Sequence, residues 1–190
     1  MNTRKKLTNL VLLALFAGLI FLMGQTPLGL IPLGFCNVTL LVIPVAVGTI
    51  YMGWKNGLIL GATFAATSLL SALTKPSARG ATLLGASPVL AIVMTGLPRL
   101  CIPLVIWGVN KLLGRLQKHV AAAIAAACGS LTNTVLYLGL MLLFYILCGI
   151  DNTQVLTTIG IVAGGAGPLE AVAAAIIVPP ILTALWRIKK

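Results

Sequence analysis

Arg99 is the residue whose place in the sequence most strongly predicts binding chemistry. It lies about eleven residues into an apolar segment that begins near Pro88, so it sits about 16 Å along a helix. A cation at that depth in a membrane is costly unless it is paired or hydrated. Pro98 and Pro103 flank it and loosen the helix. We expect Arg99 to face a wet cavity and hold an anionic group such as a carboxylate; an ion pair with Glu170, or hydrogen bonds to main-chain carbonyls, is the structural alternative.

Asn133 is the second candidate ligand-binding residue. It belongs to the polar run 130–134 inside a long apolar segment, at about the same depth as Arg99. An amide both donates and accepts hydrogen bonds, which suits the hydroxyl and amide groups of a ligand. The alternative is hydrogen bonding between helices, which Ser, Thr and Asn commonly provide in membranes.

Glu170 is one of only two acidic residues in the chain, the other being Asp151. It follows the Gly-rich run 164–167 and Pro168. A proline near the first turn and an acid just behind it are typical of a helix start. We therefore weigh two roles for Glu170, a helix-start residue or part of a pocket wall that partners Arg99.

Enzymatic chemistry is not indicated. The only histidine, His119, falls in a loop, so the Ser–His pair of an intramembrane protease is missing. Two acids cannot build a carboxylate metal site, and the four cysteines form no zinc-binding cluster. No P-loop is present, so no cofactor is expected in this chain and any ATP hydrolysis must come from partner subunits. Cys36 and Cys148 are both expected near the outer face, and their spacing leaves a disulfide between them open.

The elements that position these residues are predicted to be membrane helices. Of the 190 residues 59% are hydrophobic and only 8% are charged, against roughly 25% charged in soluble domains. We predict an all-α membrane protein, a single domain over residues 1–190. Because roughly 20 apolar residues cross a bilayer, its bundle has six transmembrane helices, at 7–24, 38–53, 57–73, 88–113, 120–148 and 168–186.

The basic residues predict the orientation of this bundle. The net charge is +11, and ten of the 13 Lys and Arg residues fall on one side if both termini are cytoplasmic. This asymmetry follows the positive-inside rule. The predicted outer loops, 25–37, 74–87 and 149–167, are longer than the inner ones and rich in Gly, Pro, Ser and Thr. We expect the first of them to fold back over the bundle and the functional face to be the outer one; the alternative is that these loops merely connect helices.

Small residues four positions apart mark two predicted helices. One carries Gly57, Gly61 and Ala65, and the other carries Ala14 and Gly18. Such spacing lets helices approach closely. Packing within this chain is one interpretation, and docking of another membrane subunit is the other.

Several motifs, in this order, resemble those of a known family. They are Asn37-Val-Thr-Leu-Leu-Val-Ile-Pro44, Gly48 to Gly53, the Gly57/Gly61 helix that ends in Thr67-Ser-Leu-Leu, Ser87-Pro-Val, Leu97-Pro-Arg99, Leu131-Thr-Asn-Thr134, Leu169-Glu-Ala171 and Val178-Pro-Pro180. With the size, the six spans and the basic inner loops, they resemble the substrate-binding S components of energy-coupling factor (ECF) vitamin transporters. Among the branches of that family the chain is most similar to the pantothenate group.

The resemblance implies a multi-pass protein of a prokaryotic plasma membrane. An S component binds its vitamin at the outer side, under the loop between the first two helices. It works with a membrane coupling (T) subunit and two ATPase subunits, and it topples in the membrane to release its cargo. The implied substrate-binding residues are Arg99, Asn133, Phe64, Glu170 and Asn37, with Phe64 against the apolar part of the ligand. Ala14 and Gly18 would meet the coupling subunit.

Other functions remain as alternatives. The chain could be an S component for another vitamin or small metabolite. It could also be a self-sufficient channel or secondary carrier, although it lacks an inverted repeat and a buried acid suited to proton coupling. A small membrane enzyme or accessory protein fits least, because the catalytic pairs are missing.

Overall fold

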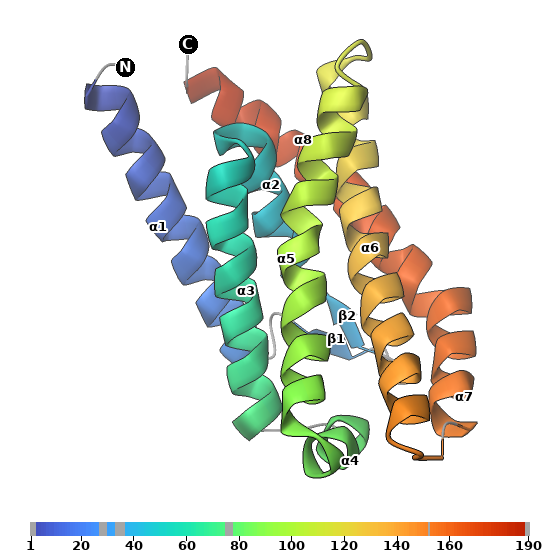
Figure 1. Cartoon of the computed structure of the whole chain (residues 1–190). Helices are drawn as coiled ribbons and strands as arrows, with labels where there is room; N and C mark the ends of the chain where they lie inside the picture. Colours follow the sequence, from blue (N-terminus) through green and yellow to red (C-terminus); the bar gives the residue numbers. More distant parts are fainter. Residues whose placement is uncertain (1–2, 27–29, 33–36, 75–77, 152, 189–190) are drawn as a thin grey trace.

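A bundle of long apolar helices dominates the computed structural model, which describes residues 3–26, 30–32, 37–74, 78–151 and 153–188 (Figure 1). Its elements are α1 (Thr3–Gln25), β1 (Leu30–Pro32), β2 (Asn37–Thr39), α2 (Val42–Met52), α3 (Trp54–Thr74), α4 (Ala78–Ala86), α5 (Pro88–Leu112), α6 (Lys118–Leu147), α7 (Thr153–Ile161), the π-helical turn η2 (Val162–Ala166) and α8 (Gly167–Ile188). Within these described residues, five helical stretches are long and apolar enough to cross a membrane: 7–25, 54–74, 88–112, 118–147 and 155–187.

The second predicted span, 38–53, is not a full-length helix. Only α2, of 11 residues, is helical there, and 11 residues extend about 16 Å, roughly half of the hydrocarbon core. The segment before it forms β2, which pairs antiparallel with β1. The apolar composition of α2 reflects burial within the protein, because its residues from Val42 to Thr49 are buried almost without exception. It packs against α1, α3, α5, α6 and α8.

Two of the predicted outer loops contain helices. The loop predicted at 74–87 includes α4. The prediction of a loop at 149–167 is wrong for most of these residues, because α7, η2 and α8 follow one another without a break. The predicted sixth span therefore starts too late. Asp151 lies two residues before this long helical stretch, and its carboxylate accepts hydrogen bonds from the main-chain N–H and the hydroxyl of Thr153. These bonds hold the pKa of Asp151 below its usual value.

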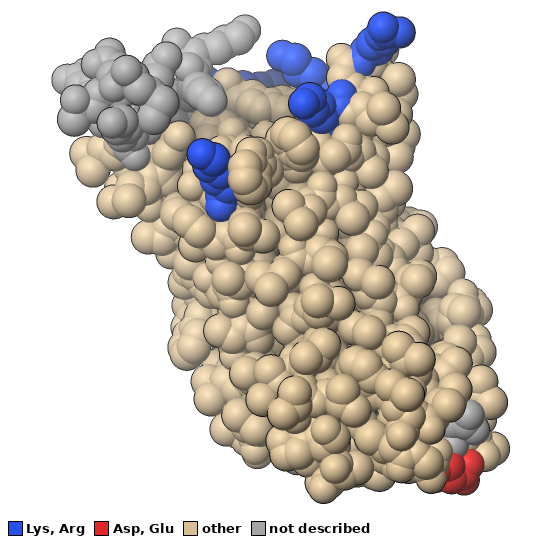
Figure 2. Space-filling model, in the orientation of Figure 1, with Lys and Arg blue, Asp and Glu red and all other residues tan. Residues whose placement is uncertain are grey.

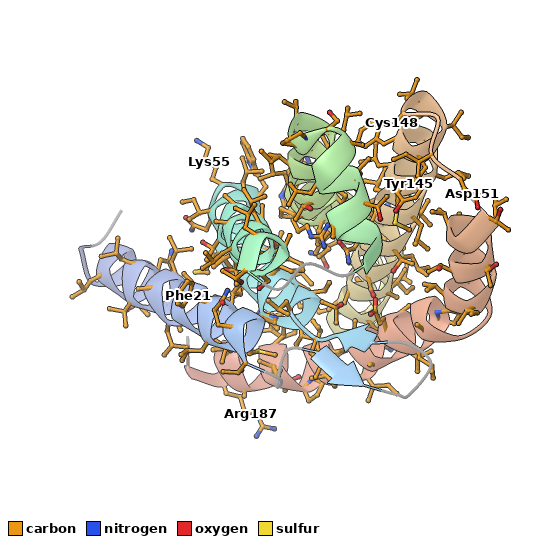
Figure 3. All side chains as sticks on the ribbon, turned by 90° about the horizontal axis from the view of Figure 1, so that it is seen from below. Phe21, Lys55, Tyr145, Cys148, Asp151 and Arg187 are labelled. Carbon is orange, nitrogen blue, oxygen red and sulfur yellow. The ribbon has the colours of Figure 1, made fainter. Side chains whose placement is uncertain are left out.

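The two ends of the bundle differ in charge. The first turn of α1, the last turn of α8 and the turn between α5 and α6 lie at one end, which we call the basic end (Figure 1). Lys and Arg side chains gather there on the face that Figure 2 shows, and the described surface between the ends of this face is formed by uncharged residues. Lys55 and Arg187 project away from the bundle, whereas Asp151 lies near the start of α7 (Figure 3). The opposite end, which carries the β-hairpin and α4, we call the hairpin end.

The apolar interior is divided into two clusters. One surrounds α2 and includes Val45, Ile102, Ala126 and Val178. The other lies toward the hairpin end, where α4 and α7 cover α5 and α6. It includes Leu83, Ala91, Met94, Leu138 and Val155. On α5, on α6 and on the α7–α8 stretch, the chain passes from one cluster to the other. Polar residues occupy those three passages.

Candidate functional site

Arg99, Asn133 and Glu170 occupy the passages between the two apolar clusters, and we call these three residues the polar layer. Arg99 lies between Met94 and Ile102 on α5. In the same way, Asn133 on α6 and Glu170 on the α7–α8 stretch each lie between residues of one cluster and residues of the other. Three helices from different parts of the sequence therefore bring their interior polar side chains to a similar depth, as the sequence predicts for Arg99 and Asn133.

The Arg99 guanidinium is held by weak contacts. Its Cζ lies 5.6 Å from the ring centre of Phe64 and 4.9 Å from that of Tyr137, distances typical of cation–π contacts. Its Nη1 donates a long hydrogen bond of 3.5 Å to the carbonyl oxygen of Met94. Pro98 has no N–H, so this carbonyl lacks its usual helical donor. The guanidinium Nε is buried and has no hydrogen-bond partner in the described part of the chain.

A second proline places the backbone of Arg99 against α3. Pro103 cannot donate to the carbonyl of Arg99, four residues before it. A side chain at Gly61 would put its Cβ 2.8 Å from that oxygen and 3.0 Å from Cγ of Pro103. Only glycine allows α3 to approach this closely. At Gly57 an added Cβ would lie 2.4 Å from Thr49 of α2. The Gly57/Gly61 face of α3 therefore packs against other helices of this chain, which is the first of the two interpretations of its small residues.

Asn133 is buried, with 7% of its surface exposed. Its Oδ1 is buried and has no hydrogen-bond partner among the described residues. Buried polar atoms nearly always find a partner in native proteins, so an exception marks a site for water or a ligand. Tyr137 lies four residues along α6 and therefore on the same helix face. The face of α6 that carries Asn133 therefore also carries the ring that contacts Arg99.

Glu170 connects three elements. Its Oε1 accepts a 2.6 Å hydrogen bond from the main-chain N–H of Thr39 in β2. Its Oε2 accepts a weaker bond of 3.4 Å from the hydroxyl of Thr134 on α6. Among the described residues it forms no ion pair with Arg99, so the ion-pair form of the structural alternative is not supported. The other form, a hydrogen bond from Arg99 to a main-chain carbonyl, is present at Met94. Since η2 leads directly into α8, Glu170 does not sit at a free helix start.

The structure places the other predicted site residues as follows. Phe64 is buried and contacts Arg99. Asn37 is the first residue of β2, opposite Pro32 in the register, and its side chain lies outside the described part. Cys36 lies outside the described residues altogether, and Cys148 is a free thiol.

Sequence reasoning missed Tyr137, Thr39 and Thr134. The i to i+4 spacing of Asn133 and Tyr137 could have revealed the first. Thr134 was noticed only as part of a polar run. The contact of Thr39 with Glu170 had no sequence signal, because it uses a backbone N–H across 131 positions of sequence.

The face of α1 that carries Ala14 and Gly18 is uncovered. Both residues are exposed, and no described atom lies within 4 Å of the Cβ that a side chain at Gly18 would add. Their neighbours Leu7, Val11 and Leu15 are also exposed. The small-residue faces of the two helices therefore differ. The face of α3 is covered by other helices of this chain, whereas the face of α1 is open.

Comparison with known proteins decides what class of protein this is. The family model described as ECF transporter, substrate-specific component, matches residues 8–182. The chain belongs to this family. No curated protein sequence matches it.

As a substrate-specific component, the protein is a substrate-capture subunit of an ECF importer and not an enzyme. Such a component binds a small molecule and acts with T and ATPase subunits. The family prediction and the prediction of a multi-pass membrane protein are thereby confirmed. The polar layer, in the interior of this substrate-capture subunit, is its candidate binding site.

Proposed function

We propose that this ECF substrate-specific component captures pantothenate. Pantothenate carries one carboxylate, one amide and hydroxyl groups, and the polar layer offers a cation and an amide at matching depth. The observation that carries the proposal is the pair of buried atoms without partners, Arg99 Nε and Asn133 Oδ1. Leaving such atoms unpaired costs about 1–3 kcal/mol each, and a ligand that satisfies both recovers that cost.

Each residue has a role in this proposal. Arg99 binds the carboxylate, with Nε and one Nη as a two-point donor. Asn133 hydrogen-bonds the amide or a hydroxyl group of the ligand. Phe64 walls the apolar part. Glu170 lines the site and holds β2 against α8. Asn37, two residues before Thr39 in the sequence, is proposed as a further substrate-binding residue.

The proposed orientation puts the hairpin end outside the cell. The basic end then faces the cytoplasm with both termini, in keeping with the positive-inside rule. The segment 38–53 counts as a sixth crossing in which β2 and α2 together reach across the membrane. The chain would lie in the plasma membrane of a prokaryote and capture its vitamin from outside.

The open face of α1 is the proposed contact with the coupling subunit. Ala14 and Gly18 let another helix approach closely. The exposed leucines beside them supply apolar area for that contact.

Ligand identification tests the proposal directly. The chain is purified in mild detergent, bound small molecules are identified by mass spectrometry, and calorimetric titrations compare pantothenate with other water-soluble vitamins. We expect pantothenate to bind without ATP and Asn133→Ala to weaken it. Asn110→Ala, near the basic end of the neighbouring α5, is the matched control and should bind normally. Tight binding of a different vitamin would show that pantothenate is not the substrate. Equal weakening of binding by both variants would show that Asn133 does not contact the ligand.

A further inference from the structure

A surface depression at the basic end is not explained by substrate capture. It has a volume of about 480 Å³ and is lined by Gly108, Lys111, Leu112 and Arg115. The spacing i, i+3, i+4 and i+7 places these residues on one side of α5 and of the turn that follows it. No atom of the described residues lies within 4 Å of the Cβ that a side chain at Gly108 would add. Gly108 is thus the open floor, and the two cations form the rim.

Two tryptophans lie beside this depression. The Lys111 ammonium is 4.9 Å from the ring centre of Trp107. Trp107 in turn contacts Trp54 of α3, with ring centres 6.4 Å apart, and the ammonium of Lys55 lies 5.8 Å from Trp54. Both indoles are more than a third exposed on the outside of the bundle. Tryptophan is enriched where a membrane protein meets the lipid headgroups, so this row marks the headgroup level.

The positive charge at the depression is not balanced by the chain itself. Its only acids are Asp151 and Glu170. Asp151 lies near the start of α7, and Glu170 is committed to Thr39 and Thr134 in the polar layer. Lys111 and Arg115 are both exposed. An anion that neutralises them would come from outside these two acids, and at headgroup level an anionic lipid phosphate is such an anion.

We propose that this depression binds the headgroup of an anionic phospholipid, such as phosphatidylglycerol, from the leaflet at the basic end. The phosphate sits between Lys111 and Arg115, and the glycerol part rests over Gly108. The exposed Leu104, one turn before Gly108 and farther from the basic end, lies along the first carbons of the acyl chains, and Leu112 lies at the level of the phosphate. The Trp54–Trp107 pair fixes the height of the site in the membrane. This assignment is independent of the substrate and of the polar layer.

Native mass spectrometry of the full chain tests the assignment. The detergent-purified protein is titrated with phosphatidylglycerol and, separately, with phosphatidylcholine, and apparent dissociation constants are measured for the first bound lipid. A basic side chain at an anionic membrane surface contributes roughly fivefold in affinity, so Lys111→Ala with Arg115→Ala should weaken phosphatidylglycerol binding about 30-fold. Gly108→Leu, which keeps both charges and fills the floor, should also weaken it. Phosphatidylcholine binding should change little.

Controls separate a built site from diffuse attraction. Lys118→Ala with Arg187→Ala removes the same charge from the same end and should leave phosphatidylglycerol binding within about threefold of the parent, because neither residue lines the depression. The proposal is overturned if this control loses as much affinity as the Lys111/Arg115 variant, or if Gly108→Leu binds normally. It is also overturned if the Lys111/Arg115 variant keeps its lipid but loses the coupling subunit on co-purification, since the surface would then belong to a protein contact.

Discussion

Replacing Arg99 by methionine should abolish recognition of the ligand's negative charge while sparing the fold. Met fills a similar volume without the guanidinium. With the described residues, Arg99 makes one hydrogen bond, at 3.5 Å, and two ring contacts. Each ring contact contributes about 0.5–2 kcal/mol, and removal of the orphaned Nε offsets part of the loss. We therefore expect Arg99→Met to fold and to extract normally in detergent.

The loss in binding should be much larger. Truncating one partner of a buried charge pair costs about 2–5 kcal/mol, which is a rise in Kd of roughly 30-fold to several thousand-fold for pantothenate. The neutral alcohol that has CH₂OH in place of the carboxylate presents no charge to Arg99. Its Kd should change by less than about threefold on the same substitution.

Isothermal titration calorimetry with both ligands, on the parent protein and on Arg99→Met, provides the comparison. Arg115→Met, at the basic end, is the matched control and should bind both ligands as the parent does. The reasoning is refuted if Arg99→Met binds pantothenate normally, because the orphaned Nε would then have no role in capture. Equal weakening of the acid and the alcohol would also refute it, since Arg99 would then only shape the site.

Three further predictions concern the elements around the site. Glu170→Gln should speed ligand dissociation in stopped-flow measurements by about 5- to 30-fold, because a neutral amide oxygen holds the Thr39 N–H less strongly than a carboxylate; an unchanged rate would mean that β2 does not retain the ligand. Gly61→Leu should destabilise the protein by about 1–3 kcal/mol through overpacking against the backbone of Arg99, whereas Gly139→Leu, which points into open space, should leave the melting temperature unchanged. Gly18→Trp should bind ligand normally but fail to co-purify with the coupling subunit, and retention of that complex would place the contact elsewhere.

The long helices could be predicted because hydropathy is a strong and local signal. The predicted spans 7–24, 57–73, 88–113 and 120–148 lie within a few residues of α1, α3, α5 and α6. The structure of segment 38–53 was harder to predict, because a short helix that is buried in protein is as apolar as a helix that faces lipid. Hydropathy alone does not distinguish these two surroundings.

The start of the last helix was missed for a different reason. Residues 149–167 contain several glycines and threonines, which favour loops in water. In a membrane the unpaired backbone of such a loop is too costly, and glycine is tolerated within helices. The chain therefore stays helical through η2, and the π-helical turn absorbs the glycines at 164 and 165.

The candidate site was predictable where the cost of burial is large. Arg99 and Asn133 stood out because charged and amide groups are expensive inside a membrane. The connections between them were not predictable, since they depend on which helix faces which. The Tyr137 ring, the Met94 carbonyl and the Thr39 N–H become partners only after the bundle has assembled.

The bond between Glu170 and Thr39 has a consequence for how sequences of this kind can diverge. The donor is a main-chain N–H, which nineteen of the twenty amino acids supply equally and only proline lacks. The side chain at position 39 is thus free to vary without loss of this anchor. A strand fastened in this way can exchange its side chains to suit new cargo, while its attachment to the last helix is inherited unchanged.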